Sequence, residues 1–215
     1  SGWGALLKPL AWQGALCYGP SPSSKATFTH PASLLKNWNG LPDPAEAAPA
    51  VIKRYLSAYG PATPETFDAW LSRNSNKKST LRSWFASLGE QIVEVRVEGE
   101  TRYLLAEHED ELAATRPSRA THLLGAFDQF VLGPGTKDTH MLAHEHRPLV
   151  SKAAGWIAPV LTQGGRITGV WEMDDGNLVV TPFPGEQAPP SQVLEDAAAR
   201  LAAVHGSVKV TPRVD

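Results

Sequence analysis

Hydrophobic residues recur every three or four positions between residues 47 and 88, which is the spacing of one face of a helix. This spacing predicts three short helices, and their inward-facing residues are Ala48, Val51, Ile52, Tyr55, Leu56 and Tyr59 in the first, Phe67, Trp70 and Leu71 in the second, and Leu81, Trp84, Phe85 and Leu88 in the third. Gly60 is placed to end the first helix. Thr63 and Pro64 then give the second helix a capping hydroxyl and a favourable first residue.

The pattern changes to strict alternation after the third helix. Three valines at positions 93, 95 and 97 share one face of a predicted strand, while Glu94, Arg96 and Glu98 share the other. Gly99 marks a turn, and Tyr103 and Leu105 lie on the return strand. Three helices followed by a hairpin predict a winged helix-turn-helix over residues 41–108.

The first 40 residues predict a helix, two strands and a linker. A helix followed at once by a hairpin is the second half of a winged-helix unit, and the first residue is not Met. We therefore expect a fragment of a longer protein that is cut inside a preceding winged-helix unit. The alternative is a helix–hairpin cap with its own packing.

Short strands dominate the chain after residue 120. The predicted strands are 123–132, 155–161, 166–173, 178–183 and 208–210, and one long helix is predicted at 189–205. Trp156 and Trp171 are expected in the core between them. Several strands with one late helix predict a small barrel or curled sheet with the helix packed on it, that is, a β-barrel-like domain over residues 109–215. The expected fold class is therefore α+β, with winged helix-turn-helix units followed by a barrel-like domain.

Composition and charge narrow the class of protein. The 215 residues are 42% hydrophobic with a formal net charge of -2, so any nucleic-acid role must depend on a local basic patch. One cysteine excludes an intrachain disulfide. Neither an apolar run long enough to span a membrane nor a signal-peptide pattern is present. We expect a cytoplasmic location and no membrane partner.

Basic residues gather before and on the third predicted helix, where a winged helix usually meets the DNA backbone. The candidate DNA-binding residues there are Arg73, Lys77, Lys78 and Arg82, with Arg96 on the hairpin. Glu94, Glu98 and Glu100 make the same hairpin acidic, which opposes DNA binding. A purely architectural winged helix is the alternative.

A second basic cluster lies between residues 137 and 152. Its candidate DNA-binding residues are Lys137, His144, Arg147 and Lys152. With His140 and His146 the cluster also has histidine spacing that a metal ion could use, but no Cys or well-spaced carboxylate completes a ligand set. The alternatives are a phosphate-contacting rim, solvated loop residues and, least favoured, a metal site; we expect no metal.

Asp128 lies in an otherwise apolar run that is predicted to be a strand. A carboxylate there must be paired or hydrogen-bonded, and the candidate partners are Arg147, Lys137 or a backbone amide. The functional alternative is a water-activating carboxylate beside a DNA channel. No dinucleotide, phosphate-loop or zinc-finger fingerprint occurs, so we expect no cofactor.

Several runs in the chain resemble winged-helix DNA-glycosylase-like proteins of the AlkZ and YcaQ type. The matching runs are Arg54-Tyr55-Leu56, Tyr59 to Pro64 followed by Phe67 and Trp70, Phe127 to Gly133, Gly155-Trp156-Ile157, and Gly165 to Trp171. The resemblance implies tandem winged helices and a barrel-like domain around a DNA channel. It also implies a bacterial enzyme family acting on alkylated bases and interstrand crosslinks.

The catalytic signature of that family is a Gln-x-Gln or Gln-x-Asp motif, which does not occur in this sequence. The resemblance therefore assigns no catalytic residue here. We expect the parent protein to be a glycosylase in DNA repair, and this chain to bind duplex DNA without catalysing base excision. The alternatives are a transcription-factor-like DNA binder that is not an enzyme, and a winged-helix scaffold that binds proteins.

Overall fold

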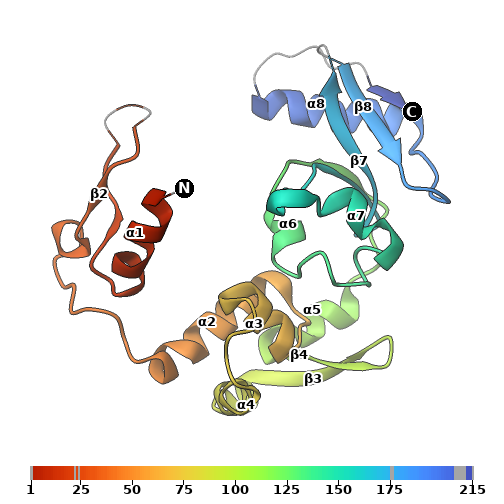
Figure 1. Cartoon of the computed structure of the whole chain (residues 1–215). Coiled ribbons are helices and arrows are strands. Elements are labelled where there is room, and N and C mark those ends of the chain that lie inside the picture. Colours follow the sequence, from red (N-terminus) through yellow and green to blue (C-terminus); the bar gives the residue numbers. More distant parts are fainter. Residues whose placement is uncertain (1, 22, 24, 175–176, 206–211, 215) are drawn as a thin grey trace. The chain divides into compact units, whose positions relative to one another are not determined.

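The computed structural model describes residues 2–21, 23, 25–174, 177–205 and 212–214 (Figure 1). The chain forms two compact units, residues 1–49 and 50–215. Helices and strands are mixed throughout, which confirms the coarse α+β prediction. Within the described residues, no helix has the length and apolar character needed to cross a membrane.

The first unit has the predicted order of one helix and two strands. Its elements are α1 (Gly2–Trp12), β1 (Cys17–Tyr18), β2 (Phe28–Thr29) and the 3-10 helix η1 (Pro31–Ser33). Each strand has two residues, and the strands pair antiparallel with Cys17 opposite Thr29. Ring stacking of Tyr18 on Phe28, with centroids 5.3 Å apart, extends this small hairpin.

The second unit begins with the three predicted helices, and the boundary between the units falls within the first of them. We call residues 50–105 the helical region; its helices are α2 (Pro44–Tyr59), α3 (Pro64–Ser72) and α4 (Lys78–Ala86). Thr63 caps α3 as predicted, because its hydroxyl accepts a hydrogen bond from the Thr66 amide at 3.1 Å. The buried core of this region consists of Ile52, Tyr55, Leu56, Ala62, Phe67, Leu81, Phe85, Leu88 and Leu105.

The prediction that Trp70 and Leu71 face inward from α3 is wrong. The side chain of Leu71 is 44% exposed and that of Trp70 is 39% exposed, whereas Phe67 is fully buried. Nine residues make only about two and a half turns, and the core contact falls on the turn that carries Phe67. Trp70 lies at the edge of the core, with its ring 5.1 Å from that of Tyr55.

The predicted hairpin follows a short 3-10 helix, η2 (Gly89–Gln91). Strands β3 (Ile92–Val97) and β4 (Glu100–Leu105) pair antiparallel, and positive φ angles of 48° at Glu98 and 88° at Gly99 form the tight turn between them. Ala62 extends this pairing by exchanging two backbone hydrogen bonds with Tyr103. The hairpin is therefore joined to the chain segment that precedes α3.

The remainder of the second unit, which we call the sheet region, contains five strands and several short helices. Its elements are η3 (Ala106–His108), α5 (Glu109–Ala114), β5 (Thr121–Leu124), α6 (Gln129–Leu132), η4 (His144–His146), α7 (Arg147–Val150), η5 (Ala153–Gly155), β6 (Val160–Gln163), β7 (Arg166–Asp174), β8 (Asn177–Pro182), α8 (Ser191–His205) and β9 (Pro212–Val214). The strand order is β5-β6-β7-β8-β9, and the last pair is parallel. Among the described residues β5 and β9 do not pair, so the sheet is open there, and the prediction of a barrel-like domain is not confirmed.

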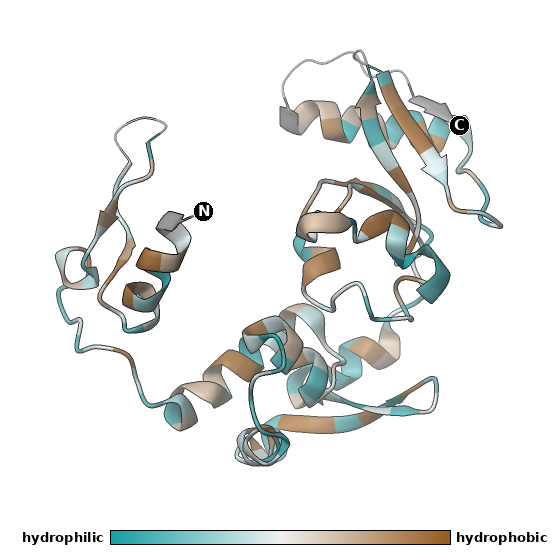
Figure 2. Cartoon of the chain, in the orientation of Figure 1, coloured by the Kyte–Doolittle hydropathy of each residue, from teal (hydrophilic) through white to brown (hydrophobic). Residues whose placement is uncertain are grey.

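Hydrophobic side chains cover both faces of this sheet. Helix α8 lies across one face (Figure 1), where Leu194, Ala197 and Ala198 pack with Trp171 and Leu178. The segment with α6 and α7 covers the other face through a second core of Val131, Met141, Leu142, Val150, Ile157, Val160, Ile167 and Phe183. Strands buried on both sides read as continuous apolar runs, as Figure 2 shows along β8. Such runs do not alternate between apolar and polar residues, so the sequence does not show how the strands are arranged in the sheet.

The predicted strand at 123–132 is wrong beyond Leu124. The chain turns at Phe127, whose φ is +58°, and helix α6 begins at Gln129. The strand predicted from residue 155 begins only at Val160. Trp171 is buried as predicted, but Trp156 is 51% exposed and rests edge-on against Phe127 outside the core. The strand predicted at 208–210 lies outside the described residues.

Specific contacts join the helical region to the sheet region. The hydroxyl of Tyr55 donates a hydrogen bond to the backbone oxygen of Gly133 at 3.2 Å, and burial raises the pKa of this phenol, so it remains a neutral donor. The ring of Tyr59 lies so close to Gly133 that an added Cβ would be 2.1 Å from it, which requires glycine at this position. These contacts fix the segment that leads into the second basic cluster.

Candidate functional site

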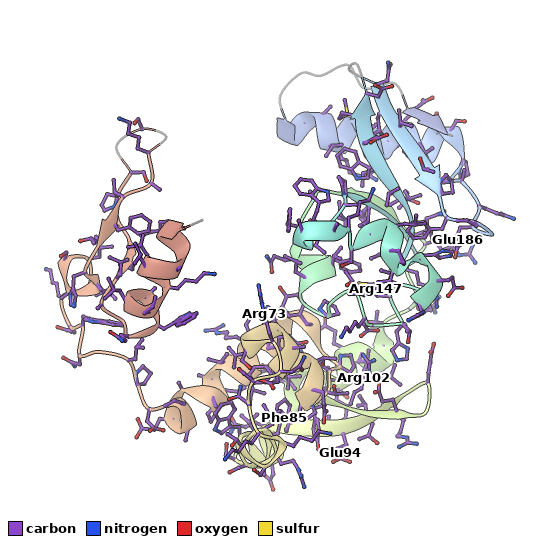
Figure 3. The ribbon with its side chains drawn as sticks, in the orientation of Figure 1. Arg73, Phe85, Glu94, Arg102, Arg147 and Glu186 are labelled. Atoms are coloured by element: carbon purple, nitrogen blue, oxygen red, sulfur yellow. The ribbon has the colours of Figure 1, made fainter. Side chains whose placement is uncertain are left out.

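The basic residues predicted around the third helix lie at the α3–α4 junction. Arg73 ends α3 in the left-handed conformation (φ 58°), Lys77 precedes α4, and Lys78 and Arg82 lie on it. All four side chains are exposed, and Figure 3 labels Arg73 at this junction. We call these four residues the helical basic surface. Among the described residues, the side chains of the helical basic surface make one hydrogen bond, from Arg82 Nε to the Lys78 carbonyl at 3.4 Å.

A buried carboxylate that the sequence analysis missed holds this junction. Asp68 is 2% exposed and accepts hydrogen bonds from the Ser72 hydroxyl and from both the side chain and backbone amides of Asn76. The Asp68 backbone oxygen also accepts from the amides of Arg73 and Asn74. These bonds fix the loop from which the helical basic surface projects. A short polar residue inside an amphipathic helix, followed by Ser and Asn, was the available signal.

The acidic hairpin side chains have partners within the protein. Glu94 accepts a hydrogen bond from the Tyr103 hydroxyl at 3.2 Å, and burial together with Glu94 raises the pKa of Tyr103. Glu98 and Glu100 approach the His140 ring at 2.9 and 3.7 Å, and Glu100 also contacts Arg102 at 2.8 Å. Arg96, a candidate DNA-binding residue, donates to the Thr101 hydroxyl at 2.8 Å and is exposed. The charge of Glu100 is thus partly balanced by the guanidinium group of Arg102.

Three of the four candidates in the second cluster come together, and one does not. Lys137, His144 and Arg147 line one pocket of about 200 Å³, whereas Lys152 is exposed and is not among the residues that line it. We call this the basic pocket, and its lining residues are Thr136, Lys137, Thr139, Leu142, His144 and Arg147. The two threonines were not predicted from the sequence.

The histidines considered as metal ligands are dispersed. His140 contacts the hairpin carboxylates, while His146 is buried with its ring 4.5 Å from that of Phe183. In the part of the chain that the structure describes, no three His, Cys, Asp or Glu side chains are grouped for a metal ion.

Asp128 has a structural role as the cap of α6. Its carboxylate accepts a hydrogen bond from the Phe130 amide at 2.8 Å, so the backbone-amide alternative is the observed one. The predicted strand position is wrong, since the carboxylate precedes a helix and is not enclosed in an apolar strand.

A buried ion pair anchors the loop of the basic pocket. Arg102 Nη1 lies 3.2 Å from Asp138 Oδ2, and the two side chains are 11% and 6% exposed. The other oxygen of Asp138 accepts from the His140 amide at 2.9 Å, and its backbone oxygen accepts from Met141 and Leu142. Arg102 comes from β4, as Figure 3 shows, so the hairpin positions the pocket loop. The sequence analysis missed both residues.

Residues 1–204 match the family described as DNA glycosylase AlkZ-like, and the chain belongs to this family, as the sequence resemblance predicted.

A curated relative is the "Interstrand DNA cross-link repair glycosylase" of Streptomyces sahachiroi, which is 54% identical over 215 residues. The alignment covers 100% of this chain and 58% of that relative. A solved structure, "Streptomyces sahachiroi DNA glycosylase AlkZ", has a TM-score of 0.95 at 54% identity and again covers 100% of this chain and 58% of the other. The chain thus spans somewhat more than half the length of the proteins it matches.

Proposed function

We propose that this chain binds duplex DNA as part of a DNA glycosylase that acts in interstrand crosslink repair. The observation that carries the proposal is the 54% identity, along the whole chain, to a glycosylase named for that repair. The two surfaces of exposed or unpaired cations supply the positive charge that contact with a DNA backbone requires. A bacterial, cytoplasmic protein acting on chromosomal DNA fits this role.

The helical region is proposed to act as a winged helix-turn-helix. Three helices, a hairpin and the backbone bridge between Ala62 and Tyr103 support this assignment. In such a unit the junction before the last helix and the helix itself lie nearest the DNA. The helical basic surface would then contact phosphates and position the duplex without reading its sequence.

Base excision is not assigned to any residue of this chain. The glutamine-containing signature expected for the family does not occur in the sequence. The proposal is therefore limited to holding the duplex, and it predicts no release of an alkylated base by this chain alone.

A protein-binding scaffold is the second candidate, because Glu94, Glu98 and Glu100 give the hairpin an acidic character. The contacts of Glu98 and Glu100 with His140 and Arg102 weaken this candidate, since they direct part of that charge toward the protein itself. A scaffold would not bind DNA even at low salt. A transcription-factor-like protein would bind one sequence much more tightly than random duplex.

The test is fluorescence anisotropy of a labelled random duplex with a triple variant of the helical basic surface, K77E/K78E/R82E. The matched control, K36E/R116E/R119E, makes the same change in net charge at three exposed residues whose side chains form no hydrogen bond or ion pair within the described part of the chain. We expect the triple variant to bind at least about tenfold more weakly than the control, because several phosphate contacts are replaced by repulsion. Equal affinity of the two variants would remove this surface from the interface. Absence of binding by the unmodified chain would reject the proposed function.

A further inference from the structure

The basic pocket has an unusual balance of charge. Lys137, His144 and Arg147 line it together with two threonine hydroxyls and Leu142, and no carboxylate is among its lining residues. Hydroxyl, imidazole, ammonium and guanidinium groups can all donate hydrogen bonds. The pocket therefore offers donors to a ligand and has no anionic group of its own.

The basic side chains of the pocket have no partners in the part of the chain that the structure describes. Across the described residues, none of Lys137, His144 and Arg147 makes a side-chain hydrogen bond or ion pair, whereas nearby Arg102 has three such contacts. The Nε atom of Arg147 is buried and has no hydrogen-bond acceptor. Buried donors are nearly always satisfied, so this one indicates an acceptor that the protein itself does not supply. A water molecule could accept one bond but would leave the cations unbalanced.

The pocket is held in shape before any ligand arrives. Asp138 bonds to Arg102 and to the backbone of its own turn, and these bonds fix the two neighbouring residues, Lys137 and Thr139. Leu142, 1% exposed, anchors the next part of the loop in the core below the sheet. A preformed set of donors loses little conformational freedom when it binds an anion.

The size of the pocket selects the kind of anion. Its volume of about 200 Å³ is below the range of roughly 300–1,000 Å³ in which drug-sized ligands and cofactors bind. A single phosphate group suits this space, because guanidinium and ammonium groups pair strongly with phosphate oxygens.

We propose that the basic pocket binds one phosphate group, with the guanidinium group of Arg147 as a direct donor. The proposal rests on the proposed function in one respect, which is that the phosphate belongs to the backbone of the bound duplex. Free inorganic phosphate has the same chemistry and is the other source that the experiment must distinguish.

The first arm of the experiment uses inorganic phosphate and the complete chain. The Nε–Hε signal of Arg147 is followed by 15N NMR and is assigned by its loss in R147Q. We expect phosphate to shift this signal far more than chloride at equal ionic strength, and the signal of exposed Arg116 to respond to both salts alike. Equal responses of Arg147 to phosphate and chloride would reject the proposal that the pocket binds phosphate, whether or not the chain binds DNA.

The second arm uses a labelled duplex and compares R147Q with the matched control R116Q. We expect R147Q to lower the slope of log affinity against log salt by about 0.9, the contribution of one phosphate contact. K137Q, at an exposed lining position, repeats the test should R147Q fail to fold. If phosphate shifts Arg147 but R147Q and K137Q bind duplex like the control, the pocket holds free phosphate and its link to DNA is wrong. Binding of phosphate without any binding of duplex would uphold the pocket and reject the proposed function.

Discussion

The helical basic surface and the basic pocket are each formed around a loop that a buried aspartate stabilises, but the two aspartates have different partners. In the described part of the chain, the Asp68 carboxylate accepts hydrogen bonds from Ser72 and Asn76, which are neutral residues within the next eight positions. Asp138 pairs with Arg102, a cation 36 residues earlier on the hairpin. The first surface is therefore organised locally, while the second depends on how the helical region packs against the sheet region.

This difference predicts how the two surfaces respond when one of these aspartates is substituted. A local hydrogen-bonded loop can be lost without disturbing the rest of the second unit. A buried ion pair between regions couples the pocket to the stability of the whole unit, because removing Asp138 takes from the largely buried Arg102 the less exposed of its two carboxylate partners. Three substitutions test the contrast.

The largest effect is expected from Asp138→Ala. It leaves Arg102, whose side chain is 11% exposed, with Glu100 as its sole carboxylate among the described residues. We expect the free energy of unfolding to fall by about 3 kcal/mol, together with loss of the phosphate response of Arg147. Urea unfolding measures the first quantity, and the exposed residue Asp110→Ala is the control, with an expected change within about 0.5 kcal/mol. A loss no larger than the ~1 kcal/mol typical of surface ion pairs would contradict the coupling.

Asp68→Ala should have a smaller and more local effect. The donors of Ser72 and Asn76 lose their acceptor, which we expect to lower the free energy of unfolding by about 2 kcal/mol. Duplex affinity should weaken because the loop that carries Arg73 loosens, while the response of Arg147 to phosphate stays unchanged. If Asp68→Ala abolished that response too, the two surfaces would not be independent.

The smallest effect is expected from Tyr55→Phe, at the contact between the two regions. The variant loses the buried hydrogen bond to Gly133, and we expect about 1 kcal/mol of destabilisation. Tyr59→Phe is the matched control, because its hydroxyl makes a long, exposed contact of 3.4 Å with Gln129. Similar unfolding midpoints for the two variants would show that the buried bond does not help to join the regions.

The helical region could be predicted from the sequence because its signals are local. Spacing of apolar residues located three helices, and Thr63 and Gly99 marked a cap and a turn that the structure contains. The error at Leu71 arose because periodicity gives a face but not how far along the helix the core extends. Tertiary packing determines that extent.

The sheet region was predicted less well because both faces of its sheet are buried. Residues 123–132 are apolar over a strand, a turn and a short helix, so no change of pattern marks where β5 ends. Barrel closure likewise depends on whether the edge strands meet, which no local pattern reports. Trp156 and Trp171 both lie in apolar runs of the sequence, and only the structure shows that the first is exposed and the second buried.

The basic residues of the candidate site could be predicted from the sequence, but the residues that position them could not. Lys137, His144 and Arg147 were grouped by their closeness in the sequence, and the structure brings them to one pocket. The pairing of Arg102 with Asp138 was not predicted, because the two residues are 36 positions apart and meet only when the helical region packs against the sheet region. Whether any of these cations contacts DNA stays a prediction.

The most direct test of the central claim is the affinity of the unmodified chain for a random-sequence duplex at 50 and 200 mM salt, measured by fluorescence anisotropy. If the helical basic surface and the basic pocket contact backbone phosphates, affinity falls steeply over this range, by about 0.9 in log slope for each contact, with little preference among sequences. Absence of binding at 50 mM, or binding that salt leaves unchanged, would contradict the account.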